Sequence, residues 1–288
     1  MPGGGLLTDL TNASTRCDAM SESSRRRSAG EPAPSRAPAG DVAISPGQPP
    51  VVDRHISQGQ REPTRGGSAG PLLLWRLHRT QRVYDRAAGN YSRRRRQWMT
   101  LGGAAAEARM LSDLAATLRP GARVLDAGSG TGALSRHIKS MCPEVELTMA
   151  DLSYAMLEQA ADVTASRVVA DVQTLPFRAG TFDVVVSSWV IETVPEPARA
   201  VAEYLRVLTQ EGRLFYTFCS RPVSTRGLFR TLPLRAIVRT CFAGHFLPKD
   251  QTAWHECASS HRFTFDEGLT TEIALSKCCA VDATWTPG

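Results

Sequence analysis

The stretch DAGSGTGALS, residues 126–135, follows the strand-like run ARVL at 122–125 and leads into a segment, 133–140, whose apolar residues recur with helical spacing. A strand, a glycine-rich turn and a helix are therefore predicted in succession. Glycines in such a turn let the backbone approach a ligand closely at the N-terminus of the helix. The turn is the candidate binding site, and two classes of ligand compete for it.

Strand-like and helix-like segments alternate on both sides of this turn. We predict strands at 123–127, 145–150, 167–170, 182–188 and 213–218, and helices at 133–140, 154–161 and from Pro195 or Pro197 to 208. Repeated strand–helix units of this spacing predict a doubly wound, mostly parallel α/β sheet with right-handed crossovers. Segment 265–278 is open between a helix and a final hairpin, with a strand favoured at 269–277.

The chain divides by composition into four parts. Residues 1–70 contain no aromatic residue, and 27 of these 70 are Gly, Pro or Ser. So little apolar surface cannot offset the entropy of ordering, which predicts a disordered tail. We expect a helical cap at 71–119, the ligand-binding core at 120–220, and a basic insertion on the substrate side at 221–288 that also completes the sheet.

Composition also narrows the cellular setting. No apolar run reaches the roughly 18 residues of a membrane span, and the seven cysteines are scattered without C-x-x-C spacing. This favours reduced thiols in the cytoplasm, with a peripheral position at a membrane left open. The histidines lack metal-site spacing, so no metal is expected. Arginines in the tail leave organelle targeting open, although its acidic residues argue against a transit peptide.

The turn fits the dinucleotide pattern G-x-G-x-x-G/A through Gly128, Gly130 and Ala133. Asp126 argues against that ligand, because a carboxylate at the strand end repels a pyrophosphate and opposes the anion preference of a helix N-terminus. With Gly132 the turn instead offers small residues throughout, against which an uncharged adenosine edge can lie. A carboxylate suits the amino group and sulfonium of S-adenosylmethionine (SAM), which is therefore the expected cofactor.

Two further carboxylates follow the next predicted strands. Asp151 ends the second strand, where it can accept both ribose hydroxyls, and Asp171 ends the third, where it can accept from the adenine amine. A helix cap or turn former explains either residue alone. Three carboxylates at successive strand ends are hard to explain without a ligand, because each loses solvation.

Four motifs between residues 120 and 220 carry a family resemblance: VLDAGSGTG, ADLSYAMLEQA, VVADVQTLPFRAGTFDVVVSS and VPEPARAVAEYLRVLTQEGRL. In order and spacing they resemble the motifs of class I SAM-dependent methyltransferases, which have a seven-stranded Rossmann-like sheet. YDRAAGNY at 84–91 resembles the YDxxAxxYD helix of the type-11 subgroup that contains quinone C-methyltransferases and malonyl-carrier O-methyltransferases, although Ser92 stands where that pattern has Asp. TQEG at 209–212 replaces the usual glycine turn before the fifth strand.

The resemblance implies roles for particular residues. Asp126, Gly128, Gly130 and Gly132 would form the turn on the methionine side of SAM. The ribose and adenine would be bound by Asp151, Leu152, Asp171 and Val172, and Ser187 would lie under the ligand at the end of the fourth strand. These are our predicted cofactor-binding residues.

A catalytic residue is not predicted firmly. Phenol or alcohol acceptors need a base, and Glu192 just past the fourth strand is a weak candidate. A surface acid leading a helix is the favoured interpretation of Glu192. Trp189 could contact the sulfonium through a cation–π interaction, but a core tryptophan is favoured.

Charge is distributed unevenly, and this bears on the acceptor. The net charge of the chain is +6, and two basic blocks, 71–120 and 221–250, flank an acidic core at 121–220. We expect a small-molecule or lipid-like acceptor that arrives from an anionic membrane surface or on an acidic acyl carrier protein. A solvated arginine face over an ordinary core is the simpler alternative. Nucleic acid is not expected, because the arginines lack interleaved aromatic residues and the fourth strand lacks the proline turn of base methyltransferases.

Three functions remain open from the sequence. The first is a SAM-dependent methyltransferase, which acts by in-line displacement. The second is a SAM-fold module that binds ligand without turnover, and it predicts SAM affinity with no transfer. The third is a nicotinamide-dependent oxidoreductase, and it predicts NAD binding that tolerates Asp126→Ala.

Overall fold

The computed structural model describes residues 71–222, 224, 229, 231–248, 259–265 and 269–277. The tail predicted at 1–70 lies outside the described residues.

One sheet organises the described part of the chain, with strand order β3-β2-β1-β4-β5-β7-β6. Its strands are β1 (Arg123–Ala127), β2 (Glu146–Asp151), β3 (Ser166–Val169), β4 (Phe182–Ser188), β5 (Leu208–Cys219), β6 (Ser259–Phe265) and β7 (Thr270–Ser276). The first five strands pair in parallel, whereas β7 runs antiparallel to both β5 and β6. The doubly wound, mostly parallel α/β prediction is confirmed, and the β6–β7 hairpin confirms the strand favoured at 269–277.

Three of the described helices correspond to the predicted segments 133–140, 154–161 and Pro195 or Pro197 to 208. The helices are α2 (Pro71–Trp98), the short π-helix η1 (Met99–Gly103), α3 (Ala104–Ala115), α4 (Ala133–Met141), α5 (Tyr154–Glu158), α6 (Pro197–Val207) and α8 (Leu232–Cys241). Ser153 caps α5 by accepting from the Met156 amide at 3.2 Å. Pro197 occupies the first turn of α6, where its missing N–H has no cost. Helix α5 is shorter than the predicted 154–161.

Alternation along the strands builds a core on each face of the sheet. Val124 packs with Met110 and Leu114 of α3 on one face, whereas Leu125 belongs to the cluster that contains Tyr204 of α6 on the other. All five side chains are fully buried. Successive strand residues point to opposite faces, so the sheet lies between two helical layers.

The predicted start of the fifth strand at Arg213 is wrong. Strand β5 begins at Leu208, directly after α6, because Leu208 is already extended with φ −70° and ψ 143°. Leu208 pairs with Phe182 and Arg213 with Val184, so the segment 209–212, expected as a turn, is instead a shift of register within β5.

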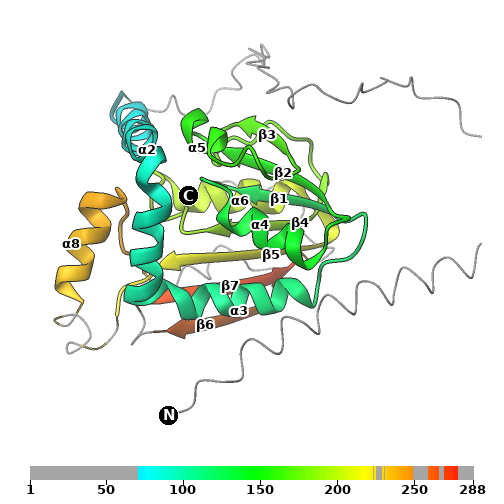
Figure 1. The fold of residues 1–288 in the computed structure, drawn as a ribbon. Coiled ribbons are helices and arrows are strands. Elements are labelled where there is room, and N and C mark those ends of the chain that lie inside the picture. Colours follow the sequence, from blue (N-terminus) through cyan, green and yellow to red (C-terminus); the bar gives the residue numbers. More distant parts are fainter. Residues whose placement is uncertain are drawn as a thin grey trace, which may run out of the picture.

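Helices α2 and α8 lie side by side beyond the carboxyl ends of the parallel strands, whereas α3 runs along the sheet near β7 (Figure 1). The Arg94 guanidinium donates to the Cys241 carbonyl at 3.4 Å, and the ring of Tyr91 meets that of Phe242 edge-on at 6.3 Å. These contacts join α2 to α8, and the pair lies at the end of the sheet where ligands of doubly wound folds bind (Figure 1).

Candidate functional site

The glycine-rich turn after β1 depends on backbone conformations that side chains disfavour. Gly128, Gly130 and Gly132 have φ of +75°, +53° and +76°. The Gly128 amide donates to the Ala150 carbonyl at 2.7 Å, which fixes the turn against the end of β2. A Cβ at Gly128 would lie 2.3 Å from Val190 Cγ2, whereas one at Gly130 would meet nothing nearer than 3.5 Å. The turn is therefore closed at Gly128 and open at Gly130.

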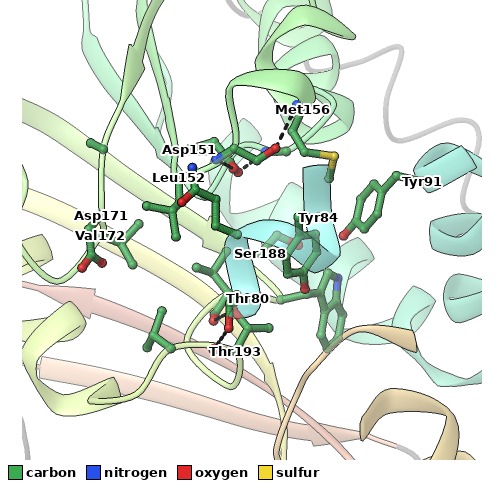
Figure 2. Close-up of a pocket in the computed structure, with 18 residues that line it drawn as sticks. Thr80, Tyr84, Tyr91, Asp151, Leu152, Met156, Asp171, Val172, Ser188 and Thr193 are labelled. Carbon is green, nitrogen blue, oxygen red and sulfur yellow. Dashed lines mark hydrogen bonds between the residues drawn. The ribbon is translucent and has the colours of Figure 1, made fainter. Parts of the chain in front are cut away.

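The open side of the turn borders a cavity, the first pocket. Helix α2 contributes Thr80, Tyr84 and Tyr91, and the turn and strand ends contribute Gly128, Gly130, Asp151, Leu152, Asp171, Val172, Ser188, Trp189 and Thr193. Figure 2 shows Tyr84 and Tyr91 across the pocket from Asp171 and Val172. Six of the predicted cofactor-binding residues thus meet in one cavity.

Asp151 is positioned by the backbone around it. Its Oδ2 accepts from the Gly130 amide at 2.8 Å and its Oδ1 from the Ser153 amide at 2.9 Å. Burial raises the pKa of Asp151 to about 6, against the lowering effect of these two hydrogen bonds. A carboxylate offers about four lone-pair sites, so two remain for a diol on the pocket side. This fits the ribose of SAM.

Asp171 lies in the turn after β3, which ends two residues earlier. Both carboxylate oxygens accept from the Gln173 side-chain amide at 3.1 Å. The carbonyl oxygen of that amide in turn accepts from the Glu196 backbone N–H at 2.9 Å. Gln173 thereby ties this wall of the pocket to the start of α6, and Val172 beside it is buried and apolar.

Asp126 and Gly132 do not line the first pocket. Asp126 lies on the face of β1 that Val124 shares, under α4, and is 1 % exposed. Its carboxylate accepts from the Ser135 hydroxyl at 2.5 Å, and burial raises its pKa to about 7. Asp126 thus does not join Asp151 and Asp171 in the lining of the first pocket, because strand alternation turns it toward the helix. Gly132 packs instead against Ala160, since a Cβ added at Gly132 would lie 2.8 Å from the Ala160 Cβ.

Ser187 is likewise turned away from the first pocket. Its hydroxyl contacts the Tyr204 hydroxyl on α6 at 3.0 Å, and it is 1 % exposed. The next residue, Ser188, lines the pocket instead. The predicted position at the end of β4 is right, but the side chain that faces the cavity is the neighbouring serine.

A second pocket adjoins the first. It shares Tyr84, Tyr91, Trp189 and Thr193 with the first pocket and adds Arg95, Trp98, Glu192, Cys219, Val238, Phe242 and Gly244. Five of these eleven residues are aromatic. The wall common to both cavities places a ligand of one beside a ligand of the other.

Glu192 is buried in the wall of the second pocket, so the favoured surface-acid interpretation is wrong. It is 3 % exposed, one carboxylate oxygen accepts from the Cys219 amide at 3.3 Å, and Oε2 has no hydrogen-bond partner. Burial raises its pKa to about 7. A carboxyl group with this pKa and a free oxygen can exchange a proton with a bound ligand near neutral pH.

An ion pair supports the other wall of the second pocket. Arg95, from the arginine run of α2, pairs with Glu107 of α3, which also accepts from the Trp189 indole N–H at 3.3 Å. Trp189 has φ of +61°, a conformation that is strained for a non-glycine residue. Its ring meets that of Trp98 edge to face, with the ring centroids 5.2 Å apart. Trp189 is therefore both a core residue, as favoured, and a wall of both pockets.

The α2 residues are the part of the site that sequence reasoning missed. Thr80, Tyr84, Tyr91, Arg95 and Trp98 line the two pockets. Their spacings of four, seven, four and three residues place them on one helical face. This stripe, which mixes polar and aromatic residues on one helical face, is the signal in the sequence that could have identified them.

Other features bear on metals, membranes and thiols. Among the residues that the structure describes, no group of three or more His, Cys, Asp or Glu side chains could hold a metal ion. Within the same ranges, no helix has the length and apolar character needed to cross a membrane. Cys142, Cys219 and Cys241 do not form disulfide bonds.

The sheet order, the glycine turn and the carboxylates after β2 and β3 are those expected of a Rossmann-like SAM-binding domain. Comparison with known families agrees, since residues 125–216 match the family described as a methyltransferase domain. The matched segment includes the glycine turn, most of strand β1 and strands β2, β3 and β4, and the cofactor that this match implies is SAM rather than a nicotinamide.

Two curated relatives illustrate the similarity. The malonyl-[acyl-carrier protein] O-methyltransferase of Geobacter sulfurreducens is 37 % identical over 136 residues, which cover 43 % of this chain and 51 % of the relative. The ubiquinone/menaquinone biosynthesis C-methyltransferase UbiE of Ectopseudomonas mendocina is 32 % identical over 155 residues, which cover 51 % of this chain and 57 % of the relative. The chain thus spans little more than half the length of these relatives.

Solved structures show the same fold. A SAM-dependent methyltransferase from Thermotoga maritima has a TM-score of 0.51 at 18 % identity, with 69 % of this chain and 99 % of that chain covered. A chain from the complex of the Haloferax volcanii Trm112 methyltransferase activator with its methyltransferase has a TM-score of 0.51 at 15 % identity, with 68 % and 97 % covered. At these identities the likeness concerns the fold alone.

Proposed function

We propose that the protein transfers a methyl group from SAM, bound in the first pocket, to a small-molecule or lipid-like acceptor bound in the second pocket. The observation that carries this proposal is the common wall of the two cavities, formed by Tyr84, Tyr91, Trp189 and Thr193. In-line displacement requires the methyl group and the acceptor atom to be aligned in a site that excludes water. Adjoining cavities with aromatic walls support such an alignment.

The first pocket has groups suited to each part of SAM. Asp151 and Leu152 are proposed to hold ribose and adenine, with Asp171 and Val172 on the adenine side. Gly128 and Gly130 provide the backbone surface for the methionine side. Bound SAM would supply the electrophilic methyl group. We propose that Asp126, Gly132 and Ser187, which do not line the pocket, act by holding the turn and the end of β4 in place.

Glu192 is the proposed general base for an acceptor that carries an O–H group. Glu192 lines the second pocket, and its Oε2 is buried without a hydrogen-bond partner. Transfer of the acceptor proton to this oxygen would leave an oxygen nucleophile, or an enolate with a nucleophilic carbon, to attack the methyl group. With a pKa of about 7, Glu192 is increasingly ionised and able to accept a proton above neutral pH.

The relatives' names provide two acceptor classes to test. One relative is named for O-methylation of a malonyl group on an acyl carrier protein, and the other for C-methylation in ubiquinone and menaquinone biosynthesis. Both are compatible with a carrier-linked or lipid-like acceptor. A cytoplasmic location stays a prediction.

Full-length protein, methyl-labelled SAM and a cell extract test the proposal. Label in the organic fraction would indicate a lipid or quinone acceptor, and label on a small acidic protein a carrier-bound acyl group. Asp151→Ala should abolish transfer. Asp162→Ala, which breaks an exposed ion pair with Arg136 outside the pocket, should leave transfer unchanged. SAM binding with no label in any fraction would instead favour a binding module without turnover.

A further inference from the structure

Helix α8 presents large apolar side chains to solvent. Phe229, just before the helix, is 72 % exposed, and Leu232 and Ile237 are 49 % and 40 % exposed. Pro233 and Ala236, which lie between them in sequence, are exposed as well. These five residues, the apolar face of α8, include half of the six exposed large hydrophobic residues of the described chain. Apolar residues gathered in this way on one short segment indicate an interaction surface.

The charges around this face are basic. Residues 221–248 contain no Asp or Glu, and Arg239 is exposed on α8 itself. The neighbouring α2 adds exposed Arg93 and Arg96, and the Arg94–Cys241 contact holds the two helices together. The partner of this surface should therefore combine negative charge with an apolar interior.

The opposite side of α8 faces the second pocket. Val238 and Phe242 line that pocket, and the Phe242 carbonyl accepts from the Tyr84 hydroxyl at 2.9 Å. One helix thus separates the proposed acceptor cavity from the apolar face. A molecule held in a bilayer beneath the apolar face would lie on the other side of α8 from the cavity.

We propose that the apolar face of α8 docks on the surface of an anionic lipid bilayer, with Phe229, Leu232 and Ile237 entering the interface and the arginines of α8 and α2 over the headgroups. A short helix with apolar residues outward and arginines beside them lies in the plane of such an interface. An acidic carrier protein would match the arginines, but three protruding apolar side chains fit the acyl boundary better. Docking of α8 on a bilayer does not depend on methyl transfer. Only the delivery of a lipid-borne acceptor to the second pocket rests on the proposed function.

Co-sedimentation of the full chain with vesicles tests the proposal, using phosphatidylcholine alone and phosphatidylcholine with a quarter phosphatidylglycerol. We expect binding to the anionic vesicles and little to the neutral ones. Ile237→Glu and Arg239→Glu should each weaken anionic binding at least fivefold, since one basic residue near the surface contributes about that factor.

Two controls match these variants in charge. Val169→Glu places the same charge at a residue 47 % exposed on β3, and Arg178→Glu reverses an exposed arginine far from α8 in the sequence. Both should bind the vesicles like the unmodified chain. Thermal unfolding of all four variants confirms that each is folded.

Three results would overturn the proposal: no preference for anionic vesicles, equal losses in the controls, or binding of an acidic acyl carrier protein through Ile237 and Arg239 without any vesicle binding. SAM affinity is measured separately by calorimetry. A chain that binds vesicles but not SAM refutes the proposed function and leaves the docking surface intact. A chain that binds SAM but not vesicles refutes the docking surface and leaves the proposed function intact.

Discussion

Substitution of Gly128 by alanine tests the turn on which the SAM site depends. Its φ of +75° disfavours any side chain, at about 1–2 kcal/mol. The added Cβ would also lie 2.8 Å from Val190 Cγ1 and 3.1 Å from Val190 Cβ. Rotation of the valine cannot move its own Cβ, so the backbone must shift, at a further cost of about 1–3 kcal/mol. We expect Gly128→Ala to lower the free energy of unfolding by both amounts.

The substitution forces Gly128 and Val190 apart. Both residues line the first pocket, so SAM affinity should fall as well. Gly121→Ala is the matched control, because Gly121 has φ of +74° but nothing within 4 Å of an added Cβ. It should show the backbone cost alone and leave SAM affinity unchanged. Urea unfolding and calorimetric titration with SAM measure both quantities. Equal effects of the two substitutions would refute the reasoning, as would the absence of coupling between Gly128→Ala and Val190→Ala in a double-mutant cycle.

The remaining predictions concern buried charges. For Glu192→Gln we expect kcat/KM to fall roughly 100-fold or more and to lose its rise with pH through about 7; an unchanged pH profile would exclude Glu192 as the base. Glu272, fully buried without a partner, has its pKa raised to about 8 by burial. The stability that its neutral form contributes is complete below the unfolded pKa near 4.5 and is lost as pH rises through about 8. Glu272→Gln should therefore flatten the decline in stability to urea between pH 5 and 9. A decline in the variant as steep as in the unmodified chain would contradict this. Arg95→Met should destabilise the fold by roughly 3–5 kcal/mol, because it leaves the buried Glu107 carboxylate without its positively charged partner. Arg95→Met/Glu107→Gln should recover much of that loss in thermal unfolding, and an equal loss in both would show that the arginine acts through packing.

Local pattern was sufficient for the glycine turn, the parallel strands and the positions of Asp151 and Asp171. A strand end and the turn after it are encoded by neighbouring residues, and in a parallel sheet the carboxyl ends lie at one edge. The direction of a side chain at that edge was less predictable. Asp126 and Ser187 face helices rather than the first pocket, because a strand reverses its side-chain direction at every residue.

Local patterns in the chain are sufficient to predict the fold class and the ligand end of the sheet, because both follow from periodicity and from residues a few positions apart. The tertiary structure alone decided the second pocket. Tyr84 meets the Phe242 carbonyl across 158 residues and the Trp189 indole meets Glu107 across 82, so these contacts join segments with no local signature for each other. The same packing buries Glu192, whose sequence surroundings resemble those of a surface acid, and raises its pKa by removing it from water.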